Sequence, residues 1–408
     1  MEGQYSSIFI DTLIILTSAV IGASLAERLK LGSIIGYLAA GLIIGPAFLN
    51  LIRDVQAPQA LAELGIVFLL FTVGLELPIE RLRQLPKTMF ALGALQMVVT
   101  TALLAGGGIL MGMSGPQAVA LGAALSLSST AIVLRLLADR RELHSRLGRG
   151  ALGILMTQDL MVGPLLVLIP ALRGTPIEMA QAIGISVVKA IAVTMLILGI
   201  GRLALKPLMN VVAASRSPEI FAALTLLLVL AAGTVTHWAG LSMAFGALLA
   251  GMLLADTAYR HQVHAEIDPF RALLLGLFFM TVGMLLDTEL LPQHGVEILL
   301  LLLGVMAIKG LVIFLLCWRL FLRPAGSMRL GLLLCQGGEF AFVLFALSGR
   351  EELVSPLLQQ ELTIVVVLSM IATPFLAKLG ERLAPSIARK TEVDTDALPQ
   401  LSGEIHDH

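Results

Sequence analysis

Long apolar runs recur along nearly the whole chain and are separated by short breaks that contain charged residues, Pro or Gly. A helix of about 20 apolar residues crosses a hydrocarbon core about 30 Å thick. Cutting the sequence at these breaks predicts about thirteen membrane-spanning helices. The loops are too short to hold a soluble domain before about residue 381. The predicted spans are 8–26, 31–49, 58–77, 87–112, 116–137, 149–171, 177–205, 218–236, 240–256, 271–287, 295–318, 327–348 and 360–380.

Composition agrees with an all-α polytopic membrane protein. Hydrophobic residues make up 57% of the chain and charged residues 13%, whereas a β-barrel would show short alternating strands. The net charge of −1 gives no indication of a nucleic-acid partner. Cys317 and Cys335 lie in apolar surroundings, which indicates buried thiols and no disulfide framework. There is no Walker loop, serine-nucleophile motif or metalloprotease signature, so an enzyme is not expected.

The basic residues predict the orientation of the spans, because Lys and Arg concentrate in cytoplasmic loops. With the N-terminus placed outside, 22 of the 27 basic residues fall in inside loops or the tail. Only Arg53, Arg173 and Arg350 fall outside, and Lys189 and Lys309 lie within spans. One missed span would invert every later loop, so the asymmetry also supports the span count. The predicted topology is N-terminus outside and C-terminus cytoplasmic.

Two short patterns reappear at nearly the same separation, which indicates an internal repeat. "GYLAAG" at 36–41 returns as "GALLAG" at 246–251, and "FLLFTVGL" at 68–75 returns as "LFFMTVGM" at 277–284. The shift of seven spans is odd, so the two copies have opposite orientation. Inverted repeats are typical of transporters. We therefore expect a transmembrane transport domain at 1–385, with repeats at about 8–171 and 218–380 and a linker helix at 177–205.

The repeat also pairs two apolar spans that small or polar residues interrupt. "LSLSSTAIV" at 125–133 corresponds to "LCQGGEFAF" at 334–342. Broken helices at corresponding positions indicate an ion site near the midplane. The alternative is that the small residues only allow close helix packing. The residues concerned are Ser126, Ser128, Ser129 and Thr130 in the first span and Gly337, Gly338 and Glu339 in the second.

Asp159 lies beside Gln158 near the middle of an apolar span, where a charged Asp costs about 2.5–3.5 kcal/mol. Ionisable residues at such depth favour a functional role. Lys309 is also in the middle of a span and is the natural ion-pair partner of Asp159, because pairing compensates both buried charges. Glu339 could cap the helix that restarts after the Gly pair or face the ion path. Both alternatives are open.

These segments resemble a known family. "LSSTAIVLRLLADR", "LMTQD", "AGMLLADTAYRHQVHAEIDPFRALLLGLFFMTVGM" and "QGGEFAFV" are similar to the Kef-type glutathione-regulated potassium efflux systems of the monovalent cation:proton antiporter-2 family. The resemblance covers essentially residues 1–385. It implies a cation/proton antiporter fold with crossed discontinuous helices, and a homodimer in which each protomer has a scaffold domain and an ion-transporting core.

The resemblance also implies roles for particular residues. The ion-binding aspartate of the family falls on Asp159, its neighbour on Gln158, and the core lysine on Lys309. The inside loop that contacts a regulatory domain falls on 260–271, with His261, Glu266 and Asp268.

We therefore expect an electroneutral K⁺/H⁺ antiporter that works by alternating access. K⁺ would bind at Asp159 with oxygen ligands from Gln158, Ser126, Ser129 and Thr130. The alternatives are a Na⁺/H⁺ antiporter and a ligand-gated, channel-like K⁺ pathway, although no TVGYG-type filter loop is present. The expected location is the bacterial inner membrane.

The sequence departs from the Kef pattern at its end. Kef-type proteins continue into a cytoplasmic Rossmann-type domain that binds nucleotide and glutathione, and its first strand would follow "GEIHDH". We therefore expect 386–408 to be a polar cytoplasmic linker toward a domain that this sequence does not contain. No cofactor is expected in this chain. The expected partners are K⁺, H⁺, lipid, a second copy of the chain, and a cytoplasmic regulatory domain or ancillary subunit.

Overall fold

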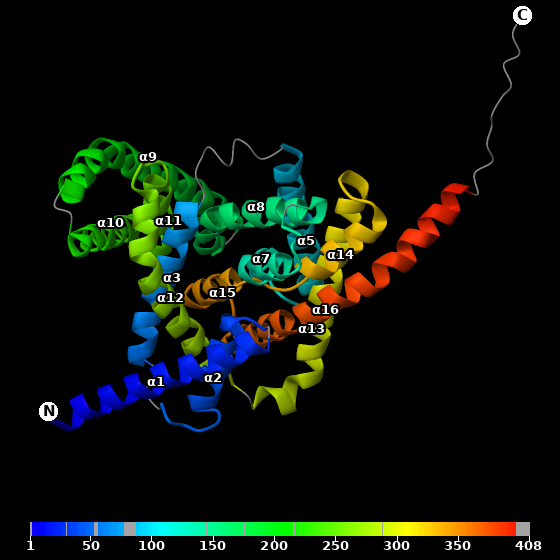
Figure 1. The fold of residues 1–408 in the computed structure, drawn as a ribbon, viewed down its shortest axis with the longest axis horizontal. Helices are drawn as coiled ribbons and strands as arrows, with labels where there is room; N and C mark the ends of the chain where they lie inside the picture. The colour runs from blue at the N-terminus through cyan, green and yellow to red at the C-terminus, as the bar shows by residue number, and fades with distance from the viewer. Residues whose placement is uncertain are drawn as a thin grey trace, which may run out of the picture.

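The computed structural model describes residues 2–29, 31–52, 56–76, 87–143, 145–173, 176–214, 217–287 and 289–396. Within these ranges the chain is helical and contains no β-strand, as the apolar runs predict (Figure 1). The helices are α1 (Glu2–Arg28), α2 (Ser33–Ile44), α3 (Gln56–Glu76), α5 (Lys87–Leu110), α6 (Gly115–Ser126), α7 (Thr130–Asp139), α8 (Arg146–Leu168), the 3₁₀ turn η1 (Ile169–Leu172), α9 (Pro176–Ala214), α10 (Pro218–Trp238), α11 (Met243–Ala255), α12 (Arg260–Met284), α13 (Leu290–Leu320), α14 (Pro324–Leu334), α15 (Phe340–Arg350) and α16 (Pro356–Asp396).

Each predicted span overlaps a helix or a pair of helices in the described chain. Nine segments among the described residues are long and apolar enough to cross a bilayer. Four shorter apolar helices accompany them: Ser33–Ile44, Leu64–Leu75, Met243–Ala255 and Phe340–Arg350. The polytopic helical class is confirmed, whereas the count of thirteen crossings stays a prediction.

One predicted loop is helical instead. The sequence was expected to span the membrane only from residue 271, but α12 begins at Arg260. Val263 and Ile267 are four residues apart and both are fully buried, in one cluster with residues of α10 and α11. This spacing places both side chains on one helical face, which favours helix over loop. The proposed regulatory residues His261, Glu266 and Asp268 therefore lie on the first turns of α12.

The last helix is also longer than predicted. The final span was expected to end at residue 380 and a polar linker to begin at 386, but α16 continues to Asp396. The sequence 381–396 contains no Gly and several strong helix formers, and α16 continues through this segment although Pro385 lies within it. The rest of the predicted linker, 397–408, lies outside the described residues.

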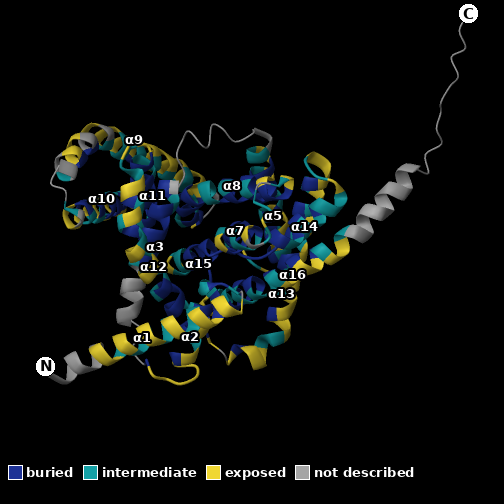
Figure 2. Ribbon diagram, in the orientation of Figure 1, coloured by how far each residue is buried: buried dark blue, intermediate teal, exposed yellow. Residues whose placement is uncertain are grey.

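The helices form two bundles. The scaffold bundle consists of α1, α2, α3, α10, α11 and α12, in which α3 packs on α11 and α12 and α2 packs on α1 and α12. The core bundle consists of α5 to α8 and α13 to α16. Helix α9 contacts α10 and α11 in the first bundle and α8 in the second. Only 6% of the residues in the apolar windows of α1 and α9 are buried. Figure 2 shows much of the described part of α1 as exposed, so a bilayer or a partner must cover these apolar faces.

The inverted repeat appears in the scaffold as duplicated glycine contacts. A Cβ on Gly41 would lie 2.0 Å from the carbonyl oxygen of Met280, and a Cβ on Gly251 would lie 2.0 Å from that of Phe71. Gly251 is the repeat counterpart of Gly41, and Phe71 is the repeat counterpart of Met280. The second contact therefore repeats the first, with the glycine and the carbonyl on the corresponding helices of the other copy. No Cβ can come this close to a carbonyl, so each helix pair needs Gly for its backbones to touch. The same relation holds for Gly74 with Leu248 and Gly283 with Leu38, each at 2.2 Å.

Candidate functional site

The first interrupted helix breaks where the sequence predicts. Helix α6 ends at Ser126, α7 begins at Thr130, and the residues between them are called the first break. Leu127 and Ser129 have extended backbones, with ψ of 145° and 112°. The Ser129 hydroxyl accepts a hydrogen bond from the backbone N–H of Ile132 at 3.4 Å and caps the new helix. The serine therefore starts the second half-helix.

The second interrupted helix crosses the first in direct contact. Helix α14 ends at Leu334, α15 begins at Phe340, and residues 335–339 form the second break. A Cβ on Gly338 would lie 2.8 Å from the carbonyl of Ser128. The Ser128 hydroxyl donates to the carbonyl oxygen of Leu334 at 2.8 Å. Gly338 thus allows the two breaks to meet, and the predicted crossing of discontinuous helices is confirmed.

Lys309 of α13 holds this crossing together. Its side chain is fully buried, and its ammonium donates to the carbonyl oxygens of Leu125 at 3.0 Å, Gln336 at 2.7 Å and Leu127. These carbonyls lie at or just beyond the C-terminal ends of α6 and α14, where helix dipoles leave partial negative charge. The predicted ion pair with Asp159 is therefore corrected, because each hydrogen bond of Lys309 ends on a backbone carbonyl.

Asp159 of α8 lies at the opposite end of the first break. The Thr130 hydroxyl is 3.2 Å from one oxygen of its carboxylate and 3.1 Å from the other. Thr130 is the first residue of α7, where the helix dipole leaves partial positive charge. The carboxylate is also only partly buried. A helix N-terminus, a hydroxyl donor and partial solvent access together offset the cost of a carboxylate at this depth.

Glu339 supplies a second carboxylate near the start of α7. It occupies the N-cap position of α15 but makes no side-chain capping bond there. Its side chain interacts instead with Ser129 and with the backbone of Ala131. The side chain is buried, and its Oε2 atom has no hydrogen-bond partner. The sequence left open whether Glu339 caps α15 or faces the ion path. Its side chain does not cap α15, and its carboxylate faces the helix crossing.

Gln158 stabilises the first break through a hydrogen bond to its backbone. Its Oε1 accepts the backbone N–H of Ser128 at 2.8 Å, and its Nε2 donates to Oε1 of Gln96 at 2.8 Å. The Ser126 hydroxyl donates to the carbonyl of Ala123 within its own helix at 2.7 Å. The amide of Gln158 and the hydroxyl of Ser126 are thus engaged in protein hydrogen bonds, and both act here to hold the backbone of the break.

Two glutamines at the crossing were missed by the sequence reasoning. Gln96 of α5 is fully buried, and its Nε2 donates to the hydroxyl of Thr100 at 3.0 Å and to the carbonyl of Ser126 at 3.3 Å. Gln336 is fully buried in the second break, and neither polar atom of its side chain has a hydrogen-bond partner. The available signal was a single Gln inside an otherwise apolar run. His261, Glu266 and Asp268 lie on α12 in the scaffold bundle, away from this crossing.

Cavities open between the bundles at both ends of the crossing. One of about 110 Å³ is lined by Gly32 of the α1–α2 connection, by Ser33 at the start of α2 and by Arg135 of α7. The other, of about 400 Å³, is lined by residues that include Thr281 of α12 and Phe342 of α15. Arg135 also forms an ion pair with Glu27 of α1, which connects the core bundle to the scaffold bundle beside the smaller cavity.

Comparison with known proteins agrees with a membrane transporter fold. The family described as "Sodium/hydrogen exchanger, transmembrane" matches residues 15–378. The chain is 44% identical over 395 residues to the chloroplastic K(+) efflux antiporter 1 of Arabidopsis thaliana, covering 93% of this chain and 33% of that protein. It is 40% identical over 396 residues to the glutathione-regulated potassium-efflux system protein KefC of Klebsiella pneumoniae strain 342, covering 97% of this chain and 64% of that protein.

The fold also matches a solved structure. The sodium proton antiporter MjNhaP1 from Methanocaldococcus jannaschii superposes with a TM-score of 0.67 at 18% identity, covering 94% of this chain and all of the other. The names of these proteins are those of transporters, in agreement with the expectation that the chain is not an enzyme. The chain spans between a third and two thirds of the length of these curated relatives.

Proposed function

The chain belongs to the sodium/hydrogen exchanger transmembrane family, and from that premise we propose that it exchanges K⁺ for H⁺ at one site, the Asp159 carboxylate. The choice of K⁺ is supported by the relatives named as K⁺ efflux antiporters and potassium-efflux proteins. A cation/proton exchange is supported by the family and by the fold of a sodium proton antiporter.

The observation that carries the proposal is the charge arrangement of the crossing. The ammonium of Lys309 lies on the carbonyl ends of α6 and α14, and the Asp159 carboxylate lies at the amino end of α7. Each of the two charges thus meets a helix end of opposite sign. Lys309 can keep its carbonyl partners while Asp159 exchanges a proton for a cation, so the scaffold of the site persists through the cycle.

Competition for one carboxylate supplies the coupling. A proton on Asp159 removes the charge that attracts K⁺, and bound K⁺ excludes the proton. Potassium prefers oxygen ligands, and the Thr130 hydroxyl already lies within hydrogen-bond distance of both carboxylate oxygens. Gln158 carries no titratable proton, so the Gln158–Asp159 pair offers one negative charge. We propose that the Glu339 carboxylate, which is buried and interacts with Ser129 and Ala131, takes no part in the exchange. One charge gives an exchange of one K⁺ for one H⁺ and therefore electroneutral transport.

Alternating access requires the core bundle to move against the scaffold bundle. The ion pair between Arg135 and Glu27 joins the two bundles beside the smaller cavity, and the larger cavity lies at the other end. With the N-terminus outside, as the distribution of Lys and Arg predicts, the smaller cavity is cytoplasmic. The geometry then corresponds to a state in which the cytoplasmic side of the transporter is closed. The ion pair between Arg135 and Glu27 must break for this side to open.

The direct test is cation-induced proton movement in proteoliposomes, measured with a pH-sensitive dye. We expect K⁺ to drive proton flux in the wild-type chain, and Asp159→Asn to remove it while the purified protein remains folded. Asp256→Asn, at the exposed end of α11, is the matched control and should transport normally. Flux in Asp159→Asn above about a tenth of wild type would contradict a single-site mechanism.

Sodium is the second candidate cation, because the matching fold is that of a sodium proton antiporter. The same assay separates the two when K⁺, Na⁺ and Li⁺ are compared at equal concentration. A larger response to Na⁺ would replace the K⁺ assignment while leaving Asp159 as the site. Single-channel currents in planar bilayers would instead indicate a channel-like K⁺ pathway.

The wider assembly is part of the proposal. We place residues 1–385 in the transport domain, with repeats at about 8–171 and 218–380. The C-terminus lies on the cytoplasmic side of the membrane. The resemblance to the Kef-type systems supports a homodimer in a bacterial inner membrane, and a cytoplasmic regulatory domain or ancillary subunit that binds nucleotide and glutathione. His261, Glu266 and Asp268, on the first turns of α12, are the proposed contact with that partner.

A further inference from the structure

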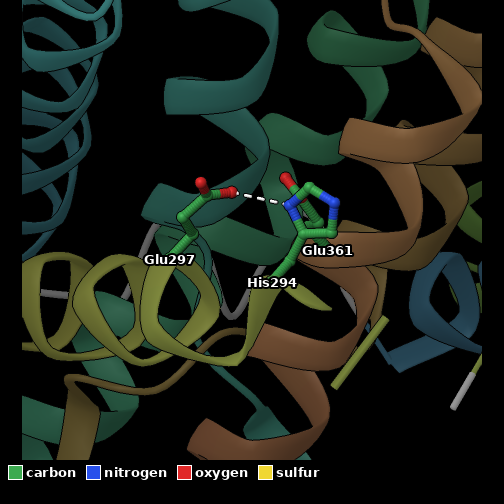
Figure 3. A group of neighbouring side chains, drawn as sticks. All are labelled: His294, Glu297 and Glu361. Carbon is green, nitrogen blue, oxygen red and sulfur yellow. Dashed lines mark hydrogen bonds and ion pairs between the residues drawn. The ribbon is translucent and has the colours of Figure 1, made fainter. Parts of the chain in front are cut away.

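Three metal-ligating side chains converge at one end of the core bundle, away from the helix crossing. His294 and Glu297 lie near the start of α13, and Glu361 lies near the start of α16 (Figure 3). His294 Nδ1 is 2.8 Å from an oxygen of Glu297 and 3.3 Å from an oxygen of Glu361. One ligand atom from each residue lies within 4.8 Å of the other two.

The local sequence explains why the three side chains meet. His294 and Glu297 are three residues apart on one helix, which places them on the same face. Helices α13 and α16 pack together, and beneath the polar group a hydrophobic cluster joins Ile298 to Val365, both almost fully buried. The Glu361 side chain is only 9% exposed, whereas that of Glu297 is 66% exposed. The group therefore has a fixed inner ligand and an open outer side.

The charges of this group favour a bound cation. Two carboxylates approach the same ring nitrogen, and the single proton that this nitrogen carries cannot satisfy both well. The Glu361 carboxylate is the more distant of the two and the more buried, so it retains much of its desolvation cost. A divalent cation would neutralise both carboxylates at once and take the imidazole as a neutral ligand.

We propose that His294, Glu297 and Glu361 bind a transition-metal dication of the Zn²⁺ type. One imidazole nitrogen and two carboxylate oxygens form a ligand set that Zn²⁺ accepts, and the exposed side leaves room for water as a further ligand. Hard cations such as Mg²⁺ prefer all-oxygen sites, so they should bind more weakly.

The position of the site gives it a consequence for the core bundle. A metal ion there would link the ends of α13 and α16. Helix α13 also carries Lys309, and α16 carries Ser369, whose hydroxyl accepts the backbone N–H of Gly337 in the second break at 2.9 Å. Metal binding should therefore stabilise the two helices that support the second break. In the proposed orientation this end faces outside, where external metal can reach it.

The test is metal binding by the full chain, purified in detergent and freed of metal with a chelator. Titration calorimetry should show one high-affinity Zn²⁺ site per chain, and Co²⁺ should give a visible absorption band. His294→Ala and Glu361→Gln should each weaken binding at least tenfold. Glu297→Gln changes an exposed side chain and should weaken binding without disturbing the fold. The metal-free melting temperature of each variant verifies that it is folded.

Two controls separate this site from the histidine at the end of α10 and from the two histidines of the tail. His237→Ala removes an exposed histidine at the end of α10 and should leave the affinity unchanged. Replacing His406 and His408 together removes the two tail histidines and should also leave it unchanged. Absence of Zn²⁺ binding, or binding that is lost only with the tail histidines, would overturn the proposal. The assay needs no transport, so its outcome is independent of the proposed exchange.

Discussion

Replacing Lys309 with Met should weaken the fold of the core bundle more than any change at Asp159. The methionine side chain has a similar length, so the substitution removes mainly the ammonium and its three hydrogen bonds to Leu125, Leu127 and Gln336. Three buried carbonyl oxygens then lose their donor, at about 1–3 kcal/mol each. The relief of a fully buried ammonium offsets part of this loss, which leaves a net destabilisation of about 2–5 kcal/mol.

A double-mutant cycle distinguishes this account from an ion pair between Lys309 and Asp159. If the two side chains were partners, Asp159→Asn would restore much of the stability lost in Lys309→Met, with a coupling of about 3–5 kcal/mol. Because the hydrogen bonds of Lys309 end on backbone carbonyls, we expect the two losses to add, with a coupling below about 1 kcal/mol. Lys189→Met, at an exposed position of α9, is the control and should melt as wild type.

The chain contains a suitable reporter for this measurement. Its two cysteines, Cys317 and Cys335, are 0% and 2% exposed, so a thiol-reactive dye labels them only when the core bundle opens. Cys317 lies on α13 with Lys309, and Cys335 lies in the second break. Thermal melting is followed by dye labelling, and denaturant titration is carried out in mixed micelles. Together they give the stability of both single variants and of the double variant. Rescue of Lys309→Met by Asp159→Asn would refute the reasoning.

Three further predictions follow from particular contacts. Gly41→Ala should lower the free energy of unfolding by about 1–3 kcal/mol because its Cβ meets a carbonyl oxygen at 2.0 Å, whereas Gly107→Ala, with open space around it, should be neutral or stabilising by up to about 1 kcal/mol; equal melting temperatures would contradict the close approach. Thr130→Val should weaken apparent K⁺ affinity about tenfold through loss of about 1.4 kcal/mol, and Thr130→Ser should restore it; an unchanged transport constant in the valine variant would exclude the hydroxyl as a ligand. Arg135→Gln should make Ser33→Cys, in the smaller cavity, react several-fold faster with a water-soluble thiol reagent, because the ion pair to α1 is lost; an unaltered rate would mean that the pair does not close this side.

Much of the fold could be predicted because it depends on patterns that are local in the sequence. The apolar runs predicted the helices, and the residues "SLSST" and "QGGE" predicted where two of them break. The repeat could also be found, because Gly41 and Gly251 are needed for the same contact in two copies of one packing arrangement. The extension of α12 to Arg260 was missed because polar residues there conceal the buried face of Val263 and Ile267.

The partners of the buried charges could not be predicted in the same way. Asp159 and Lys309 were both found from the sequence, because a charge in an apolar span stands out whatever its surroundings. Their pairing was wrong, because backbone carbonyls do not appear in a side-chain pattern. A helix that breaks frees carbonyl oxygens at its end, and three of these take the place of a carboxylate as acceptors for the Lys309 ammonium.

The sequence by itself determined that this protein is a bundle of membrane helices with an inverted repeat, two broken helices, and the carboxylates of Asp159 and Glu339 within apolar spans. These features depend on which residues lie next to each other along the chain. The tertiary structure decided that Lys309 binds the ends of α6 and α14, whose carbonyls lie up to 184 positions away, and that His294 and Glu361 meet at the end of the core bundle. Such contacts depend on how helices distant in sequence cross, and only the packed bundle brings their ends together.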